Sequence, residues 1–207
     1  MNLKSRLFQS DPQQDRIYYE NSEAVQLLSE TLLKHLPRLY YKPIVIICIG
    51  TDRSTGDCLG PLIGSAIKKE IAHFHVYGTL KDPVHAVNLE ETLEMIKEKH
   101  NNPFIIAIDA CLGRLKSVGY IQVDKGSIKP GAGVNKDLPA VGDMHITGIV
   151  NISGYMEFLV LQNTRLHLVM SMADIISHGI ISAEKAYVEK RVEVRSKWLD
   201  SQDSVIN

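Results

Sequence analysis

Two aspartates in this chain occupy positions where they could act together as one chemical unit. Asp57 lies in a polar loop after the apolar segment 44–49, and Asp109 ends a second apolar segment, 104–108. Two carboxyl groups held together in a partly desolvated crevice cannot both ionise freely, so the pKa of one of them rises. Such a pair can activate a water molecule and protonate a leaving amine, which is the chemistry of aspartic-type peptide hydrolysis.

Each aspartate also has a purely structural explanation. Asp57 could cap a helix that begins near Gly60, because aspartate is a preferred N-cap residue. Asp109 could accept hydrogen bonds from backbone amides at the end of its strand. The shared position of the two aspartates, each after an apolar segment, favours a joint functional role over two separate structural ones.

His145 is a third candidate for the same site. It follows the Gly142-Asp143 turn and precedes a segment that we expect to be helical, so it could reach the same region. With the two carboxylates it would complete an oxygen, oxygen, nitrogen ligand set suited to a zinc- or nickel-like ion. The alternatives are an exposed loop histidine or a hydrogen-bonding partner of Asp143. The sequence contains no H-E-x-x-H motif and no paired Cys-x-x-Cys motif.

Candidates for substrate binding lie in the polar loop and in a second, glycine-rich loop: Arg53, Ser54, Thr55, Gly131 and Gly133. Arg53 would either anchor a substrate carboxylate or pair with the neighbouring Asp52.

Two other chemistries are less well supported by the same residues. Cys58 and Cys111 could act as thiol nucleophiles, but carboxylates beside them raise the pKa of a thiol, which favours packed, protonated cysteines. The loop could cradle a phosphate, yet it lacks the lysine of a P-loop, and Asp52 and Asp57 would repel an anion.

The elements that must position these residues follow an alternating pattern. We expect helices at 24–36, 60–74, 89–100, 151–162 and 182–199, and strands at 44–50, 75–80, 103–109, 120–123 and 166–170. Continuous apolar strands that alternate with helices indicate an α/β fold with a mostly parallel sheet covered on both faces. Because open α/β sheets place their ligands at the carboxyl ends of the strands, both aspartates should meet at that edge.

Composition narrows the class of protein further. The chain has 207 residues, of which 44% are hydrophobic, enough for one α/β domain at 21–207 after a flexible arm at 1–20. A net charge of -1 gives no electrostatic case for binding nucleic acid or an anionic membrane. We expect no signal peptide and no membrane span. Three cysteines suit free thiols in a reducing compartment, so we expect a cytoplasmic protein.

The same motifs resemble a known superfamily. The spacing Gly50-x6-Asp57-x2-Gly60, the strand end Ile108-Asp109-Ala110 and the later His145 resemble the hydrogenase maturation endopeptidases. Thr55-Gly-Asp-Cys-Leu-Gly-Pro61 is closer to the Thr-Pro-Asp-Ala-Leu-Gly-Pro segment of the spore germination protease, and the glycine-rich segment 128–136 also resembles that protease. Over about residues 20–190 the chain is most similar to the YyaC-type sporulation proteins of endospore-forming bacteria.

The resemblance implies a three-layer α/β/α fold of the phosphorylase/hydrolase type. In the germination protease, the positions that match Asp57 and Asp109 are the proposed catalytic pair. In the hydrogenase peptidases, a glutamate, an aspartate and a histidine match Asp57, Asp109 and His145, and they bind the nickel of the substrate precursor or a surrogate metal. The shorter aspartate at position 57 follows the germination branch.

The resemblance therefore implies a sporulation-associated aspartic-type endopeptidase that uses no cofactor. Its substrate would be a protein or peptide, with small acid-soluble spore proteins as the implied class, in the forespore or spore core. His145 would orient one carboxylate or stabilise the tetrahedral intermediate. Two alternatives stay open: an inactive module that binds a peptide or partner on the same fold, and a metal-binding peptidase with Asp57, Asp109 and His145 as ligands. The oligomeric state is not indicated.

Overall fold

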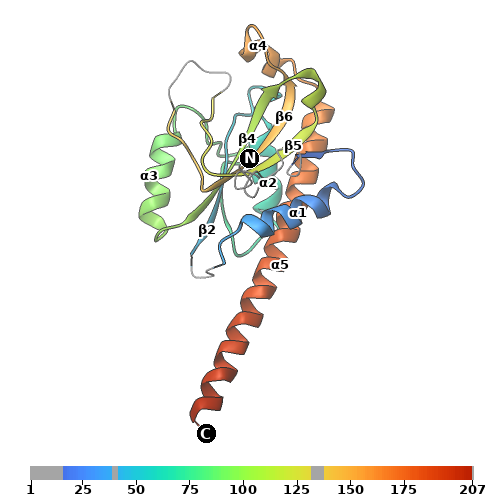
Figure 1. The fold of residues 1–207 in the computed structure, drawn as a ribbon. Coiled ribbons are helices and arrows are strands. Elements are labelled where there is room, and N and C mark those ends of the chain that lie inside the picture. The colour runs from blue at the N-terminus through green and yellow to red at the C-terminus, as the bar shows by residue number, and fades with distance from the viewer. Residues whose placement is uncertain (1–15, 39–41, 132–137, 207) are drawn as a thin grey trace, which may run out of the picture.

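A six-stranded sheet forms the centre of the protein (Figure 1). The computed structural model describes residues 16–38, 42–131 and 138–206. The strands are β1 (Arg16–Tyr18), β2 (Ile44–Cys48), β3 (His75–Tyr77), β4 (Phe104–Gly113), β5 (Tyr120–Lys125) and β6 (Met144–Ile152). Their order across the sheet is β1-β5-β6-β4-β2-β3. The pairs β2–β3, β2–β4 and β4–β6 are parallel, whereas β5 runs antiparallel to both β6 and β1.

Helices cover the sheet on both faces, as the sequence predicted. They are α1 (Ala24–His35), α2 (Leu59–Ile67), α3 (Leu89–Lys99), α4 (Glu157–Gln162) and α5 (Leu166–Ile206), with a short 3-10 helix at Leu115–Ser117. The helices α1, α2 and α5 pack together on one face, and α3 lies on the other (Figure 1). The predicted α/β fold with three layers and a mostly parallel sheet is confirmed.

The alternating sides of the central strands explain their continuous apolar sequences. In β2, the side chains of Ile44, Ile46 and Cys48 belong to the core beneath α1, α2 and α5. Val45 and Ile47 belong to the second core beneath α3. Because both faces of such a strand are buried, both sets of alternating positions must be apolar.

The strand order reverses between β2 and β4, and this places the site. From β2 the chain passes through α2 to β3 on one side, whereas from β4 it continues to β5 and β6 on the other side. A reversal of this kind opens a crevice at the carboxyl ends of the two strands, where α/β proteins bind ligands. Asp57 follows β2 and Asp109 lies in β4, so both reach this crevice.

Several expected elements differ in the structure. The helix expected at 60–74 ends at Ile67, and the strand expected to end at Asp109 continues to Gly113. The segment expected to be a helix at 151–162 begins as the end of β6, and its helix, α4, starts only at Glu157. The segment 166–170, expected to be a strand, forms the first turns of the 41-residue helix α5. A short apolar run fits a strand or a buried helix equally well. Here the buried positions Val169, Met172, Ala173 and Ile176 have helical spacing.

The N-terminal segment contributes a strand to the sheet edge. Arg16–Tyr18 pairs with β5 as β1 and falls within the stretch 1–20 for which the sequence predicts an arm. Residues 1–15 of that stretch lie outside the described residues.

The helix α5 is long and apolar enough over Leu166–Val194 to cross a membrane, judged by length and composition alone. Core helices of water-soluble proteins pass the same test. In this structure the apolar face of α5 packs against α1 and α2, as the side of a core helix does.

Candidate functional site

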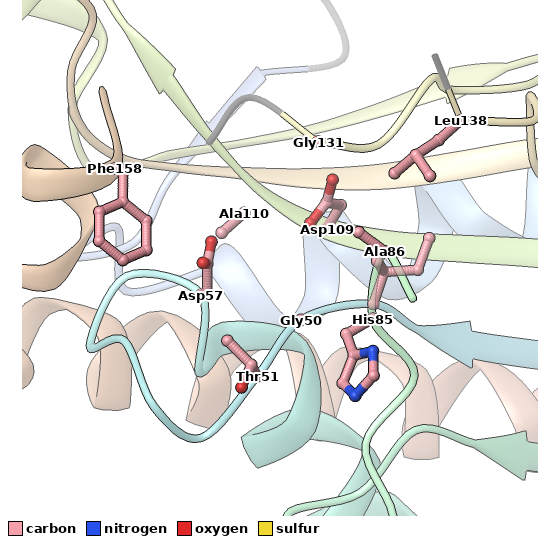
Figure 2. Close-up of a pocket in the computed structure, with 11 residues that line it drawn as sticks. Gly50, Thr51, Asp57, His85, Ala86, Asp109, Ala110, Gly131, Leu138 and Phe158 are labelled. Atoms are coloured by element: carbon pink, nitrogen blue, oxygen red, sulfur yellow. The ribbon is translucent and has the colours of Figure 1, made fainter. Parts of the chain in front are cut away.

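Asp57 and Asp109 line one pocket of about 150 Å³ at the carboxyl edge of the sheet. Figure 2 shows the two carboxyl groups arising from separate elements, with Phe158 beyond Asp57 and Leu138 beyond Asp109. The other lining residues come from the ends of β2 and β4 and from three loops: Ile49, Gly50, Thr51, His85, Ala86, Ala110 and Gly131. A space of this size accepts a small group, such as one side chain or a peptide unit with water, and is below the usual range of cofactor pockets.

The loop that carries Asp57 folds back on the end of β2. The N–H of Thr51 donates to the carbonyl oxygen of Asp57 at 3.2 Å, and the N–H of Gly50 donates to the carbonyl oxygen of Val84 at 2.8 Å. Gly50 has a φ of 144°, and a Cβ atom there would overlap the carbonyl oxygen of Asp57. Glycine at position 50 therefore permits the close approach that holds Asp57 at the pocket.

Asp57 does not cap the helix that follows it. The N-cap residue of α2 is Cys58, and that cap has no side-chain hydrogen bond. The structural explanation for Asp57 as a helix cap is thereby removed, and its carboxyl group is available to the pocket.

Asp109 is buried within β4, one residue beyond the point where the pairing of β4 with β2 ends. It pairs with Thr147 on the neighbouring strand β6, and only 8% of the residue is exposed. Asp109 lies on the same face of β4 as Ala107, whose side chain belongs to the core beneath α3. The carboxyl group of Asp109 thus lies just beyond that core, where the pocket begins.

Burial raises the pKa of both carboxyl groups. The pKa of Asp57 rises because of desolvation, and the nearby Ser54 hydroxyl acts in the opposite direction. The pKa of Asp109 rises well above its ordinary value through desolvation first and the negative charge of Asp57 second, while the Ala110 amide opposes the rise. Both the deeper burial of Asp109 and the negative charge of Asp57 therefore favour a proton on Asp109.

The structure does not bring His145 into this pocket. The residue lies inside β6, not in a loop before a helix, and its side chain is 17% exposed. Its Nδ1 is 2.9 Å from the carbonyl oxygen of Gly126, and its Nε2 is 4.0 Å from the carboxylate of Asp124. Asp143, the partner that the sequence offered, instead accepts the N–H of Ile105 at 2.8 Å.

The described residues contain no group of three histidine, cysteine or acidic side chains placed to hold a metal ion. The predicted ligand set of Asp57, Asp109 and His145 is thus not assembled within the part of the chain that the structure describes.

The predicted substrate-binding residues lie in different environments. Gly131 lines the pocket, as predicted, whereas Gly133 lies outside the described residues. Arg53 is exposed and Ser54 is buried behind the loop, and neither lines the pocket. The Ser54 hydroxyl has no hydrogen-bond partner of good geometry among the described residues, although it lies near Asp57. Thr55 is half-buried and also lies outside the pocket lining.

His85 lines the pocket, and sequence reasoning missed it. Its Nδ1 accepts the N–H of Val87 at 3.3 Å, which leaves the proton of the neutral ring on Nε2. The residue belongs to no recognisable motif. The sequence signal for His85 was its position in the loop after β3, because loops that follow parallel strands reach the same edge of the sheet. In the structure the neighbouring Val84 forms a parallel β-bridge with Ile49, at the end of β2.

The cysteines near the site favour the protonated form. Burial and the charge of Asp109 raise the pKa of Cys111 to about 11. Burial, Asp52 and Asp57 raise the pKa of Cys58. A thiol nucleophile needs the opposite shift, so the chemistry of the pocket rests with the two carboxyl groups.

Comparisons with known proteins agree with this fold and span most of the chain. The crystal structure of a NiFe hydrogenase maturation protease, HycI from Thermococcus kodakarensis KOD1, superposes with a TM-score of 0.51 at 15% sequence identity. The match covers 75% of this chain and 99% of HycI, and it shows a shared fold.

Sequence comparison gives the family. An uncharacterized protein of Bacillus subtilis (strain 168), YyaC, is 54% identical over 182 residues, which cover 87% of this chain and 89% of YyaC. The model of the family described as protein of unknown function (DUF1256) matches residues 16–179. The chain therefore belongs to the DUF1256 family.

Proposed function

We propose that this protein is a peptidase that hydrolyses polypeptide bonds with Asp57 and Asp109 acting as one acid–base pair. The observation that carries the proposal is their shared, partly desolvated pocket, in which the charge of one carboxyl group raises the pKa of the other. The fold shared with a hydrogenase maturation protease supports the same class of reaction.

The reaction would begin with Asp57 ionised and Asp109 protonated. Asp57 removes a proton from a water molecule as the water oxygen attacks the carbonyl carbon of the peptide bond. Asp109 donates its proton to the carbonyl oxygen, which gives a neutral tetrahedral intermediate. The proton on Asp57 then passes to the leaving nitrogen as the C–N bond breaks, and a hydroxyl proton of the intermediate returns to Asp109. Both carboxyl groups thus regain their starting states.

The proposed biological role is in sporulation, with small acid-soluble spore proteins as substrates in the forespore or spore core. Two observations support it: the likeness of the segment 55–61 to the germination protease motif, and the identity of 54% to a protein of Bacillus subtilis. These small proteins are polypeptides, which a site that activates water beside an amide can hydrolyse.

Incubation of the purified protein with small acid-soluble spore proteins, followed by mass spectrometry, tests the proposal. The wild type should release discrete fragments, and Asp57→Asn should abolish them because the base that activates water is lost. Asp52→Asn is the matched control, since Asp52 lies exposed in the same loop and outside the pocket, and it should cleave normally. Binding of these substrates without cleavage would favour the inactive binding module, and cleavage by Asp57→Asn would refute the proposed chemistry.

A further inference from the structure

A short segment beside the pocket exposes an unusual number of large apolar side chains. Within residues 152–159, five such side chains are more than a third exposed: Ile152 (44%), Tyr155 (99%), Met156 (69%), Phe158 (52%) and Leu159 (42%). We call these five residues the apolar segment. Exposed apolar residues that cluster in this way mark interaction sites more often than singly scattered ones do.

The apolar segment is continuous with the aspartate pocket. Phe158 belongs to both, because it lines the pocket together with Asp57 and Asp109. Figure 2 shows its ring next to Asp57 on the side of the pocket away from Asp109. Figure 1 shows α4, which carries Phe158 and Leu159, at the edge of the sheet where β4 ends.

Backbone contacts fasten α4 to the loop that carries Asp57. The N–H of Gly56 donates to the carbonyl oxygen of Leu161 at 2.9 Å. A Cβ atom at Gly56 would come within 2.8 Å of Leu161 Cδ2 and 3.1 Å of the Leu161 carbonyl oxygen, so the loop and α4 are in close contact here. The next residue in the chain after Gly56 is Asp57 itself. Any ligand held on α4 is thus held in a fixed relation to that carboxyl group.

Side-chain contacts hold the other end of the same segment. The amide nitrogen of Asn151 donates to the carbonyl oxygen of Val160 and to the hydroxyl of Thr164, both at 3.2 Å. Met156, at the start of α4, has a left-handed backbone with φ of 60°, which is uncommon for a side chain of its kind. Hydrogen bonds therefore fix the backbone of α4, while the large apolar side chains of the apolar segment stay exposed to water.

The charge of the segment distinguishes between possible occupants. Residues 152–159 contain one charged residue, Glu157, and no lysine or arginine. A surface that binds anionic lipid would carry basic residues beside its apolar ones. An apolar strip without basic residues that leads into a pocket with two carboxyl groups instead suits an extended polypeptide with a bulky apolar side chain.

We propose that the apolar segment is the substrate-recognition surface of this protein, and that it binds a bulky apolar side chain of an extended polypeptide next to the bond in the pocket. This inference rests on the proposed peptidase function, whose substrate class it narrows. Substrate side chains that lie on Tyr155 and Phe158 would be removed from water, while the neighbouring peptide bond reaches Asp57 and Asp109.

Photo-crosslinking tests the surface without relying on cleavage. The probes are two ten-residue peptides of glycine and serine with a small alkyl diazirine at one end, which differ in one central residue, leucine or serine. The full-length Asp57→Asn variant serves as the receptor, so that bound peptide stays intact. The leucine peptide should crosslink to residues 152–162 about tenfold more than the serine peptide, because burial of a leucine side chain contributes at least that factor.

Variants at exposed positions give the control. The double substitution Tyr155→Ser with Phe158→Ser, added to the receptor, should remove the difference between the two peptides. Val192→Ser alters a side chain of similar exposure (62%) on α5, outside the apolar segment, and should leave the difference intact. Equal crosslinking of the two peptides, crosslinks that map elsewhere, or no crosslinks at all would each overturn the inference.

The two proposals can fail separately. If the wild type cleaves spore proteins but neither peptide marks residues 152–162, the recognition surface is wrong and the peptidase stands. If the leucine peptide marks the segment but the wild type cleaves nothing, the surface stands as that of a binding module and the proposed reaction is wrong.

Discussion

At the scale of single residues, burial of the Asp109 carboxyl group leads us to expect that the stability of the protein depends on pH. The pKa of this group is raised in the folded protein, so between the unfolded and folded pKa values the native state holds a proton that the unfolded state has lost. The free energy of unfolding therefore falls as the pH rises through that window. Asp109→Asn removes this penalty, and we expect the variant to be more stable than the wild type at pH 7.

Urea denaturation at pH 7 and at pH 3 checks this prediction. The advantage of Asp109→Asn should vanish at the lower pH, where the carboxyl is protonated in both states. In thermal unfolding, each ~1 kcal/mol that Asp109→Asn adds to the free energy of unfolding would raise the Tm of a protein of this size by about 2–4 °C. Asp52→Asn, at an exposed position, should change little at either pH. A less stable Asp109→Asn at pH 7 would show that the charged form of Asp109 is favoured after all.

A second prediction at this scale concerns the effect of replacing Gly50 on the free energy of unfolding. The φ of 144° at Gly50 disfavours any other residue, and a Cβ atom would also overlap the backbone of Asp57. We expect Gly50→Ala to lower the free energy of unfolding by more than the roughly 1–3 kcal/mol of backbone strain alone. Gly126→Ala is the matched control, because Gly126 has a φ of 92° and a Cβ atom added there would meet no atom within 4 Å. Equal losses in the two variants, measured by chemical denaturation, would mean that the overlap at Gly50 is harmless.

At the scale of elements, Glu184 fixes the long helix α5 to a distant turn. It is buried, and one carboxylate oxygen accepts the N–H groups of Ala72, His73 and Phe74 at 2.6 to 3.1 Å. Glu184→Ala leaves three amides without this acceptor and should cost roughly 3 kcal/mol or more, whereas Glu184→Gln keeps one oxygen and should cost less. Thermal unfolding with the exposed Glu189→Ala as reference measures the difference. Similar Tm values for all three variants would contradict this anchoring role.

Sequence reasoning succeeded for elements whose pattern has one interpretation. The segments of β2 and β4 are continuous and apolar because both of their faces are buried, and this pattern predicted the strands and the shared edge of the two aspartates. It failed at residues 166–170, because a run of five residues with four apolar side chains fits either period, and only packing against α1 and α2 selects the helix. It placed His145 before a helix and so missed β6, although five of the seven residues from Ile146 to Ile152 are β-branched, a composition that favours a strand.

The site shows the same limits. Asp57, Asp109 and Gly131 could be assigned to one pocket because a motif or a strand end marks their positions. Phe158 could not, since it lies in a segment without a motif, and the signal for His85 is only the position of its loop after β3.

At the scale of the whole molecule, the reversal of strand order brings the two aspartates together. Asp57 follows β2, and its chain continues to one side of the sheet, while Asp109 lies in β4, whose chain continues to the other side. The charge of Asp57 adds to burial in raising the pKa of Asp109. The central claim is therefore that two residues 52 positions apart in the sequence titrate as one unit.

The measurement that tests this claim most directly is a carbon-13 NMR titration of the aspartate carboxyl groups in the wild type and in Asp57→Asn. In the wild type, Asp109 should titrate well above the ordinary range of aspartate. In Asp57→Asn its pKa should fall but stay raised, because the charge of Asp57 is removed and the burial is not. An Asp109 that titrates in the ordinary range, or that keeps the same pKa in both proteins, would contradict the account.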